Sequence, residues 1–141
     1  MQIQPYLNFD GRCDDAIAFY KKALGAEVQT LMRFKDSPEP RAAGNLPPGA
    51  QDKVMHASLR IGDAVLMASD CHCKGQPAFQ GVSLSLTVAN DSQAERAFGA
   101  LSEGGKVCVP LNKTFFASKF GVVTDRFGVT WMILAAPQQP A

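Results

Sequence analysis

The segment KVMHASLRI, residues 53–61, sets one histidine in an alternating strand pattern. A neutral imidazole near pH 7 can act as a general base or bind a metal, so His56 is the candidate catalytic residue. The alternative is a histidine that only hydrogen-bonds within the sheet, because no partner carboxylate is identifiable from spacing. Alternation also predicts that His56, Ser58 and Arg60 share one face, opposite an apolar face suited to packing.

The run Cys71-His72-Cys73 offers three further metal-binding side chains. Adjacent residues on a loop cannot surround one ion without a fourth group, and zinc motifs separate paired cysteines by two to four residues. We therefore do not predict a metal site there, although binding by these three residues stays open. Cys13 and Cys108 are predicted to be small, buried or partly buried residues.

Two halves of the chain repeat one pattern of strand, helix and three strands. Each helix has an apolar stripe and a glycine just past its end. The first half has predicted strands at 2–9, 26–34, 53–61 and 64–69, with a helix from 14 to 24 that ends before Gly25. The second has strands at 82–88, 106–112, 120–124 and 129–135, with a helix capped by Asp91 or Ser92. Aligning the later strands superposes Met67 on Met132 and Arg60 on Asp125.

Three segments carry a resemblance to a known family: YLNFDGRCDDAIAFYKKALGAEV, KVMHASLRIGDAVLMASD and TFFASKFGVVTDRFGVTWMI. They resemble the vicinal-oxygen-chelate superfamily of glyoxalases, bleomycin-resistance proteins and extradiol dioxygenases. The nearest branch is the PhnB-like one, labelled 3-demethylubiquinone methyltransferase. The resemblance implies an α+β fold in which two βαβββ modules form a curved, barrel-like mixed sheet, with outer helices around a shared cavity. We expect one domain over 1–141, with modules at 1–70 and 81–141 and a linker at 71–80.

The resemblance also implies four metal-ligand positions, which in this sequence are Pro5, Met67, Ser83 and Met132. Proline has no side-chain donor, and thioethers are poor ligands for the superfamily's metals. We therefore expect no metal and no cofactor. The sequence also lacks the glycine-rich turn after a strand that many methyltransferases use.

A pocket lined by mixed side chains is the preferred alternative to polar faces that simply meet water. Arg60 could recognise a carboxylate or phosphate, whereas Asp125 is favoured as the cap of its own DRFG turn. Phe115 and Phe116 lie in the segment KTFFASKFG, as either a lid over a ligand or a dimer contact. The predicted ligand-binding residues are Ser58, Arg60, Met67, Ser83, Ser85, Thr87, Phe115, Phe116 and Met132.

Composition and charge exclude several partners. The net charge is +1 and the longest basic run is two residues, which argues against nucleic acid or a membrane surface. The N-terminus lacks a signal-peptide pattern, so we expect a cytoplasmic protein, and the resemblance implies a homodimer. The leading functional hypothesis is a non-catalytic binder of a small, partly apolar molecule. The alternative is an enzyme with His56 as general base or as ligand of an unlocated metal.

Overall fold

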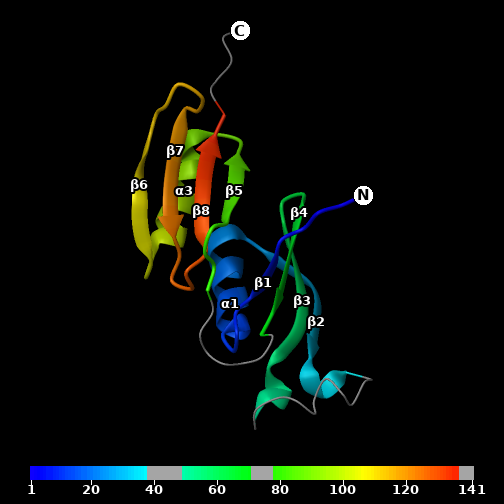
Figure 1. Cartoon of the computed structure of the whole chain (residues 1–141). Coiled ribbons are helices and arrows are strands. Elements are labelled where there is room, and N and C mark those ends of the chain that lie inside the picture. Colours follow the sequence, from blue (N-terminus) through cyan, green and yellow to red (C-terminus); the bar gives the residue numbers. More distant parts are fainter. Residues whose placement is uncertain (38–48, 71–77, 137–141) are drawn as a thin grey trace. The chain divides into compact units, whose positions relative to one another are not determined.

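The computed structural model describes residues 1–37, 49–70 and 78–136. The chain divides into two compact units, residues 1–77 and 78–141. Each unit runs strand, helix, strand, strand, strand, as the repeat in the sequence predicts (Figure 1). The described residues contain no helix long and apolar enough to cross a membrane.

The first module forms a four-stranded mixed sheet. Its elements are β1 (Tyr6–Asn8), α1 (Cys13–Leu24), β2 (Glu27–Arg33), β3 (Val54–Ile61) and β4 (Ala64–Ser69), with 3₁₀ turns η1 (Phe34–Asp36) and η2 (Ala50–Asp52). The strand order is β1-β4-β3-β2. The first strand runs parallel to the last, and the other pairs are antiparallel.

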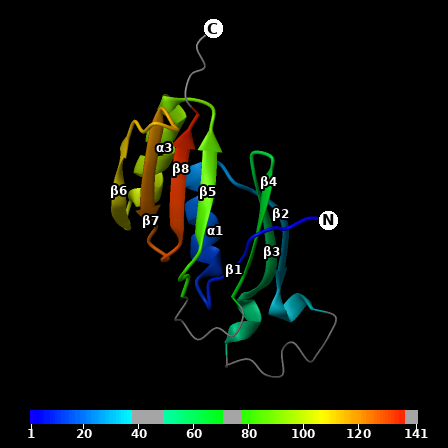
Figure 2. The ribbon, with the colours of Figure 1, turned by 45° about the horizontal axis from the view of Figure 1, so that its top comes forward.

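The second module repeats this topology. Its elements are β5 (Ser83–Val88), α3 (Asp91–Ser102), β6 (Lys106–Asn112), β7 (Lys119–Thr124) and β8 (Thr130–Ala135). The strand order is β5-β8-β7-β6, again with the first and last strands parallel (Figure 2). In the described part of the chain, two open four-stranded mixed sheets with two α-helices confirm the predicted α+β class.

Most predicted boundaries agree with the structure to within two residues, and two differences have a physical reason. The first strand is only three residues long: it begins directly after Pro5, which has no amide hydrogen to donate, and the chain turns just beyond it at Asp10 and Gly11, which both have positive φ. The cap of α3 is Asn90, not Asp91 or Ser92. Asn90 keeps an extended backbone, and its side-chain oxygen accepts a hydrogen bond from the Gln93 amide at 2.9 Å.

Alternation gives each sheet a buried face and an open face. Ala57 and Leu59 of β3 are fully buried, as are Val123 of β7 and Ile133 of β8. The residues between them point to the opposite side and stay half-buried or exposed. We call that side of each sheet its open face, and it carries most of the side chains singled out from the sequence.

Candidate functional site

On the open face of the first sheet, His56 is hydrogen-bonded to a tyrosine. The Tyr6 Oη atom lies 3.1 Å from His56 Nδ1, and the two ring centroids are 5.7 Å apart. Among the described residues, no other hydrogen bond to the His56 ring is seen. Sequence spacing gave no partner for His56, because Tyr6 belongs to β1, which reaches this face only through pairing with β4.

The structure brings Met67 and Ser58 next to this pair. Met67 is in register with Tyr6 on one side and with Ser58 on the other. The Ser58 hydroxyl lies 3.4 Å from Gln29 Oε1, a long contact that leaves it able to bind elsewhere. Tyr6, His56, Ser58 and Met67 thus form one cluster of mixed polarity.

Arg60 does not stand on this face as an isolated cation. Its guanidinium forms an ion pair with Glu27 of the neighbouring strand, with Nη2 and Oε2 2.5 Å apart. Both side chains are more than half exposed, so the pair contributes little to stability. The nearby carboxylate offsets the positive charge that would attract a carboxylate or phosphate.

The predicted residues of the second module also lie on one open face. Ser83, Ser85 and Thr87 alternate along β5, and each is exposed. Strand register arranges this face in three rows, each running from β5 across β8 to β7. The rows are Ser83–Thr130–Thr124, Ser85–Met132–Val122 and Thr87–Leu134–Phe120.

A cluster of phenylalanine rings lies beside the third row. Phe115 is almost fully exposed, and its ring meets that of Phe116 edge to face at 5.1 Å. Phe116 makes the same contact with Phe120, also at 5.1 Å. Thr114 fixes the loop, because its hydroxyl accepts hydrogen bonds from the amides of Phe116 and Ala117.

In the strand register, the implied metal-ligand positions of each module are not direct partners. Met67 stands beside Tyr6, not Pro5, and Met132 stands beside Ser85, not Ser83. The described residues contain no group of three or more histidine, cysteine, aspartate or glutamate side chains able to hold an ion. A thioether, a phenol and a hydroxyl do not match the donors of the superfamily's metals. Cys71, His72 and Cys73 lie outside the described residues.

Asp125 has the structural role that its turn predicts. Its side chain is buried, and Oδ1 accepts hydrogen bonds from the amides of Phe127 and Val129 at 2.9 and 3.1 Å. Oδ2 also accepts one from Trp131 Nε1 at 2.9 Å, a contact that the sequence did not indicate. Asp125 therefore organises the turn before β8.

The two cysteines of the described part differ in exposure. Cys13 is buried as predicted, and burial together with the nearby Asp70 and Asp14 carboxylates raises the pKa of its thiol, which stays protonated. The prediction of at least partial burial is wrong for Cys108, which is exposed. Cys108 lies on β6, the outer strand of its sheet, where the ladder is interrupted.

A polar network that sequence reasoning missed joins the start of α1 to β2 and β3. Asp70 is fully buried and accepts hydrogen bonds from the amides of Gly11, Cys13 and Val54, at 2.7 to 2.9 Å. Asp70 thereby accepts a hydrogen bond from the first turn of α1, whose N-cap residue Arg12 makes no side-chain hydrogen bond to the helix. The signal in the sequence was a lone aspartate directly after a strand.

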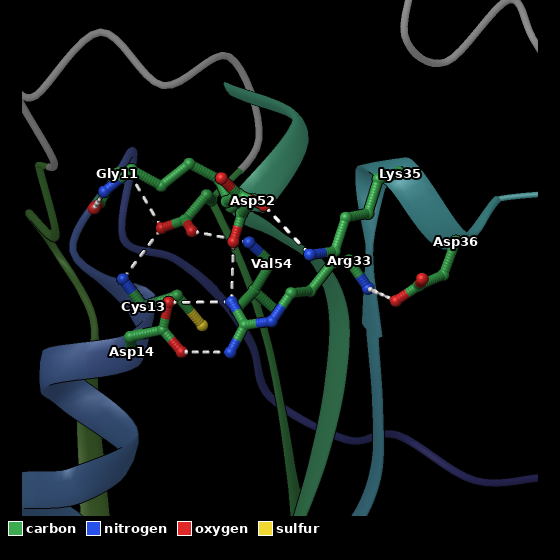
Figure 3. A network of polar contacts seen from close by, with 10 residues as sticks. Gly11, Cys13, Asp14, Arg33, Lys35, Asp36, Asp52 and Val54 are labelled. Carbon is green, nitrogen blue, oxygen red and sulfur yellow. Dashed lines mark hydrogen bonds and ion pairs between the residues drawn. The ribbon is translucent and has the colours of Figure 1, made fainter. Parts of the chain in front are cut away.

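Arg33 holds the outer part of this network (Figure 3). Its two terminal nitrogens each donate to Asp14 at 2.9 Å, and Nη1 also donates to the Asp52 carbonyl at 2.6 Å. The hydrogen bonds from Arg33 lower the pKa of the Asp14 carboxyl. The network lies at the end of the sheet and fixes the strand that carries His56.

The topology and the two open faces define a protein of the vicinal-oxygen-chelate fold, as the resemblance implies. A family model described as 3-demethylubiquinone-9 3-methyltransferase matches residues 1–134, and the chain belongs to this family. It is 39% identical to protein YjdN of Escherichia coli strain K12, over 99% of each chain.

Two solved structures show how far the likeness extends. The structure of PA1353 from Pseudomonas aeruginosa is 44% identical, with a TM-score of 0.83 over 96% of this chain and 98% of that one. A PhnB protein from Bacillus cereus is 25% identical, with a TM-score of 0.77 over 96% of this chain and all of that one. These matches confirm the PhnB-like branch.

Proposed function

We propose that this protein binds a small, partly apolar molecule against the open faces of its sheets. The observation that carries the proposal is the contrast between the two sides of each sheet. The buried face is packed core, whereas the open face presents hydroxyls beside Met67 and Met132. Small-molecule sites combine a largely apolar lining with a few placed polar groups.

The donor chemistry favours binding without a metal. The resemblance places the superfamily's ion at Pro5, Met67, Ser83 and Met132, and the strand neighbours of the two methionines are Tyr6 and Ser85. Thioethers are flexible and polarizable, so they adapt to apolar ligands while coordinating the relevant metals poorly. The same positions therefore suit a binding surface better than a metal centre.

One observation supports a second candidate, an enzyme with His56 as general base. If Nδ1–H donates to the Tyr6 oxygen, the imidazole presents an unprotonated Nε2, which can take a proton from a substrate. If Tyr6 donates instead, a neutral ring carries its proton on Nε2 and cannot act as a base there. Nitrogen-15 NMR of the imidazole distinguishes these tautomers, and an Nε2–H tautomer in wild type would remove the enzyme proposal.

Binding is tested with N-phenyl-1-naphthylamine, an uncharged probe that fluoresces in apolar surroundings. We expect saturable binding, and several-fold weaker binding in Met67→Gln or Met132→Gln, because each change places an amide on an open face. Leu31→Gln is the matched control, since Leu31 is also half exposed but pairs with Ala57 of the buried face. No saturable binding, or equal loss in the control, would refute the proposal.

We also propose that both modules act as one domain, with residues 71–80 as a linker, in a cytoplasmic homodimer. The family resemblance supports this arrangement. Light scattering coupled to size-exclusion chromatography tests the dimer, and a monomer at micromolar concentration would contradict it.

A further inference from the structure

The open face of the second module has one end rich in hydroxyl groups. Thr124 and Thr130 lie in register on β7 and β8, with their Oγ1 atoms 3.1 Å apart. Cys108 Sγ lies 3.4 Å from Thr124 Oγ1, and Ser83 stands next to Thr130. These groups donate and accept hydrogen bonds without carrying a charge.

The opposite end of the same face is apolar and aromatic. Four residues further along β8, Leu134 lies in register with Phe120. Phe116 extends this end through its edge-to-face contact with Phe120. Met132 lies between the two ends and continues the apolar surface.

Ionisable side chains are nearly absent from this face in the described part of the chain. Apart from the Cys108 thiol, strand register places only Lys106 on it, at the outer edge of the sheet beside Thr124. Asp125 and Lys119 alternate to the other side, where Asp125 is buried and Lys119 approaches Glu95. The open face of the first module, by contrast, carries His56 and the Arg60–Glu27 pair.

From this gradient we infer that the second open face binds an uncharged amphiphile, with oxygen-bearing groups at the Thr124–Thr130 end and an apolar or aromatic part at the Phe120 end. The inference rests on the proposed binding function and specifies its ligand. Four residues of strand separate the two ends, which is about 13 Å. An ionised ligand would lose hydration here without gaining a partner of opposite charge, unless it reached Lys106.

The test uses two probes of similar shape and different charge. Prodan (6-propionyl-2-dimethylaminonaphthalene) is uncharged and has a ketone at one end of an aromatic body, and 6-dimethylamino-2-naphthoate carries a carboxylate there. Trp131, the only tryptophan of the chain, precedes Met132 on β8 and serves as energy donor to a bound naphthalene. We expect saturable energy transfer to prodan and at least tenfold weaker binding of the naphthoate.

Variants at the two ends of the open face show where the probe binds. Phe116→Ala should weaken prodan binding about three- to tenfold, and Thr130→Val a similar amount, while Thr130→Ser keeps the hydroxyl and should bind like wild type. Circular dichroism verifies that each variant is folded. Leu31→Ala, in the other module, should leave binding unchanged.

The outcomes separate the inference from the broader proposal. Naphthoate binding equal to or tighter than prodan binding, with Met132→Gln still harmful, would overturn the uncharged class and keep the binding function. Failure of both probes, with N-phenyl-1-naphthylamine still bound, would overturn the inference alone, whereas failure of all three probes would remove the binding proposal as well. A prodan dissociation constant that rises steeply with protein concentration would mean that a second copy of the chain covers this face, which also overturns the inference.

Discussion

Replacing Asp70 tests whether a buried carboxylate holds the first module together. Its three amide partners come from the turn before α1, from α1 itself and from β3. Asp70→Ala leaves the buried amides of Cys13 and Val54 without an acceptor, at about 1–3 kcal/mol each. We therefore expect the free energy of unfolding to fall by about 2–6 kcal/mol, a large share of the roughly 5–15 kcal/mol typical of a domain.

Urea unfolding followed by circular dichroism measures this loss of stability, and two further variants are compared with Asp70→Ala. Asp70→Asn keeps one oxygen but turns an NH₂ group toward the Val54 amide, so about 1–3 kcal/mol should be lost. Asp63→Ala, at an exposed turn residue, should change stability by less than about 0.5 kcal/mol. If Asp70→Ala cost no more than Asp63→Ala, the assignment of Asp70 as the anchor of α1 would be wrong.

Three further predictions follow from other parts of the structure. The folded-state pKa of Asp14 lies below its unfolded value, so its ion pair with Arg33 stabilises the fold above about pH 4 and is lost as the pH falls through the folded pKa. Because the pair is partly exposed, the stability advantage of wild type over Asp14→Asn should stay below about 1 kcal/mol at pH 7 and vanish in urea titrations near pH 2. Gly121→Ala should lower the free energy of unfolding by about 1–3 kcal/mol, because the new Cβ would lie 2.5 Å from the Phe98 ring. The control Gly99→Ala places its Cβ in open space on a helix and should raise the free energy of unfolding by about 0.8 kcal/mol. Elemental analysis of the purified protein should find no stoichiometric Mn, Fe, Co, Ni or Zn; one equivalent that survives dialysis would contradict the donor-set argument.

Most of the fold could be predicted from local patterns, because helices and strands depend largely on residues that are close together in the sequence. The alternation of Ser83, Ser85 and Thr87 placed them on one face, and the structure shows the same alternation. The glycine after α1 marked its end correctly, since Gly25 adopts the left-handed conformation there. Periodicity of this kind can be recognised in a single sequence.

The details of the candidate site depend on pairing between distant segments, which a single sequence does not display. The hydrogen bond between Tyr6 and His56 needs β1 to align with β4 at one register, in which Met67 pairs with Tyr6 and not with Pro5. The hydrogen bonds of Asp70 could not be predicted, because its partners lie 16 to 59 positions away in the sequence. The Thr124–Thr130 contact likewise needs the turn at Asp125 to be known.

The pairing of the first strand with the last has a consequence for synthesis on the ribosome. Tyr6 meets its partner Met67 only 61 residues later, and Ser85 meets Met132 only 47 residues later. Almost the whole of each module must therefore leave the exit tunnel before its first strand can pair with its last. Because the first module ends before the second begins, it can complete its ladder while the second is still being translated. A nascent chain that stops before β4 has emerged would expose an unpaired strand and the apolar side of its helix, which makes that point of elongation the one most open to chaperones and misfolding.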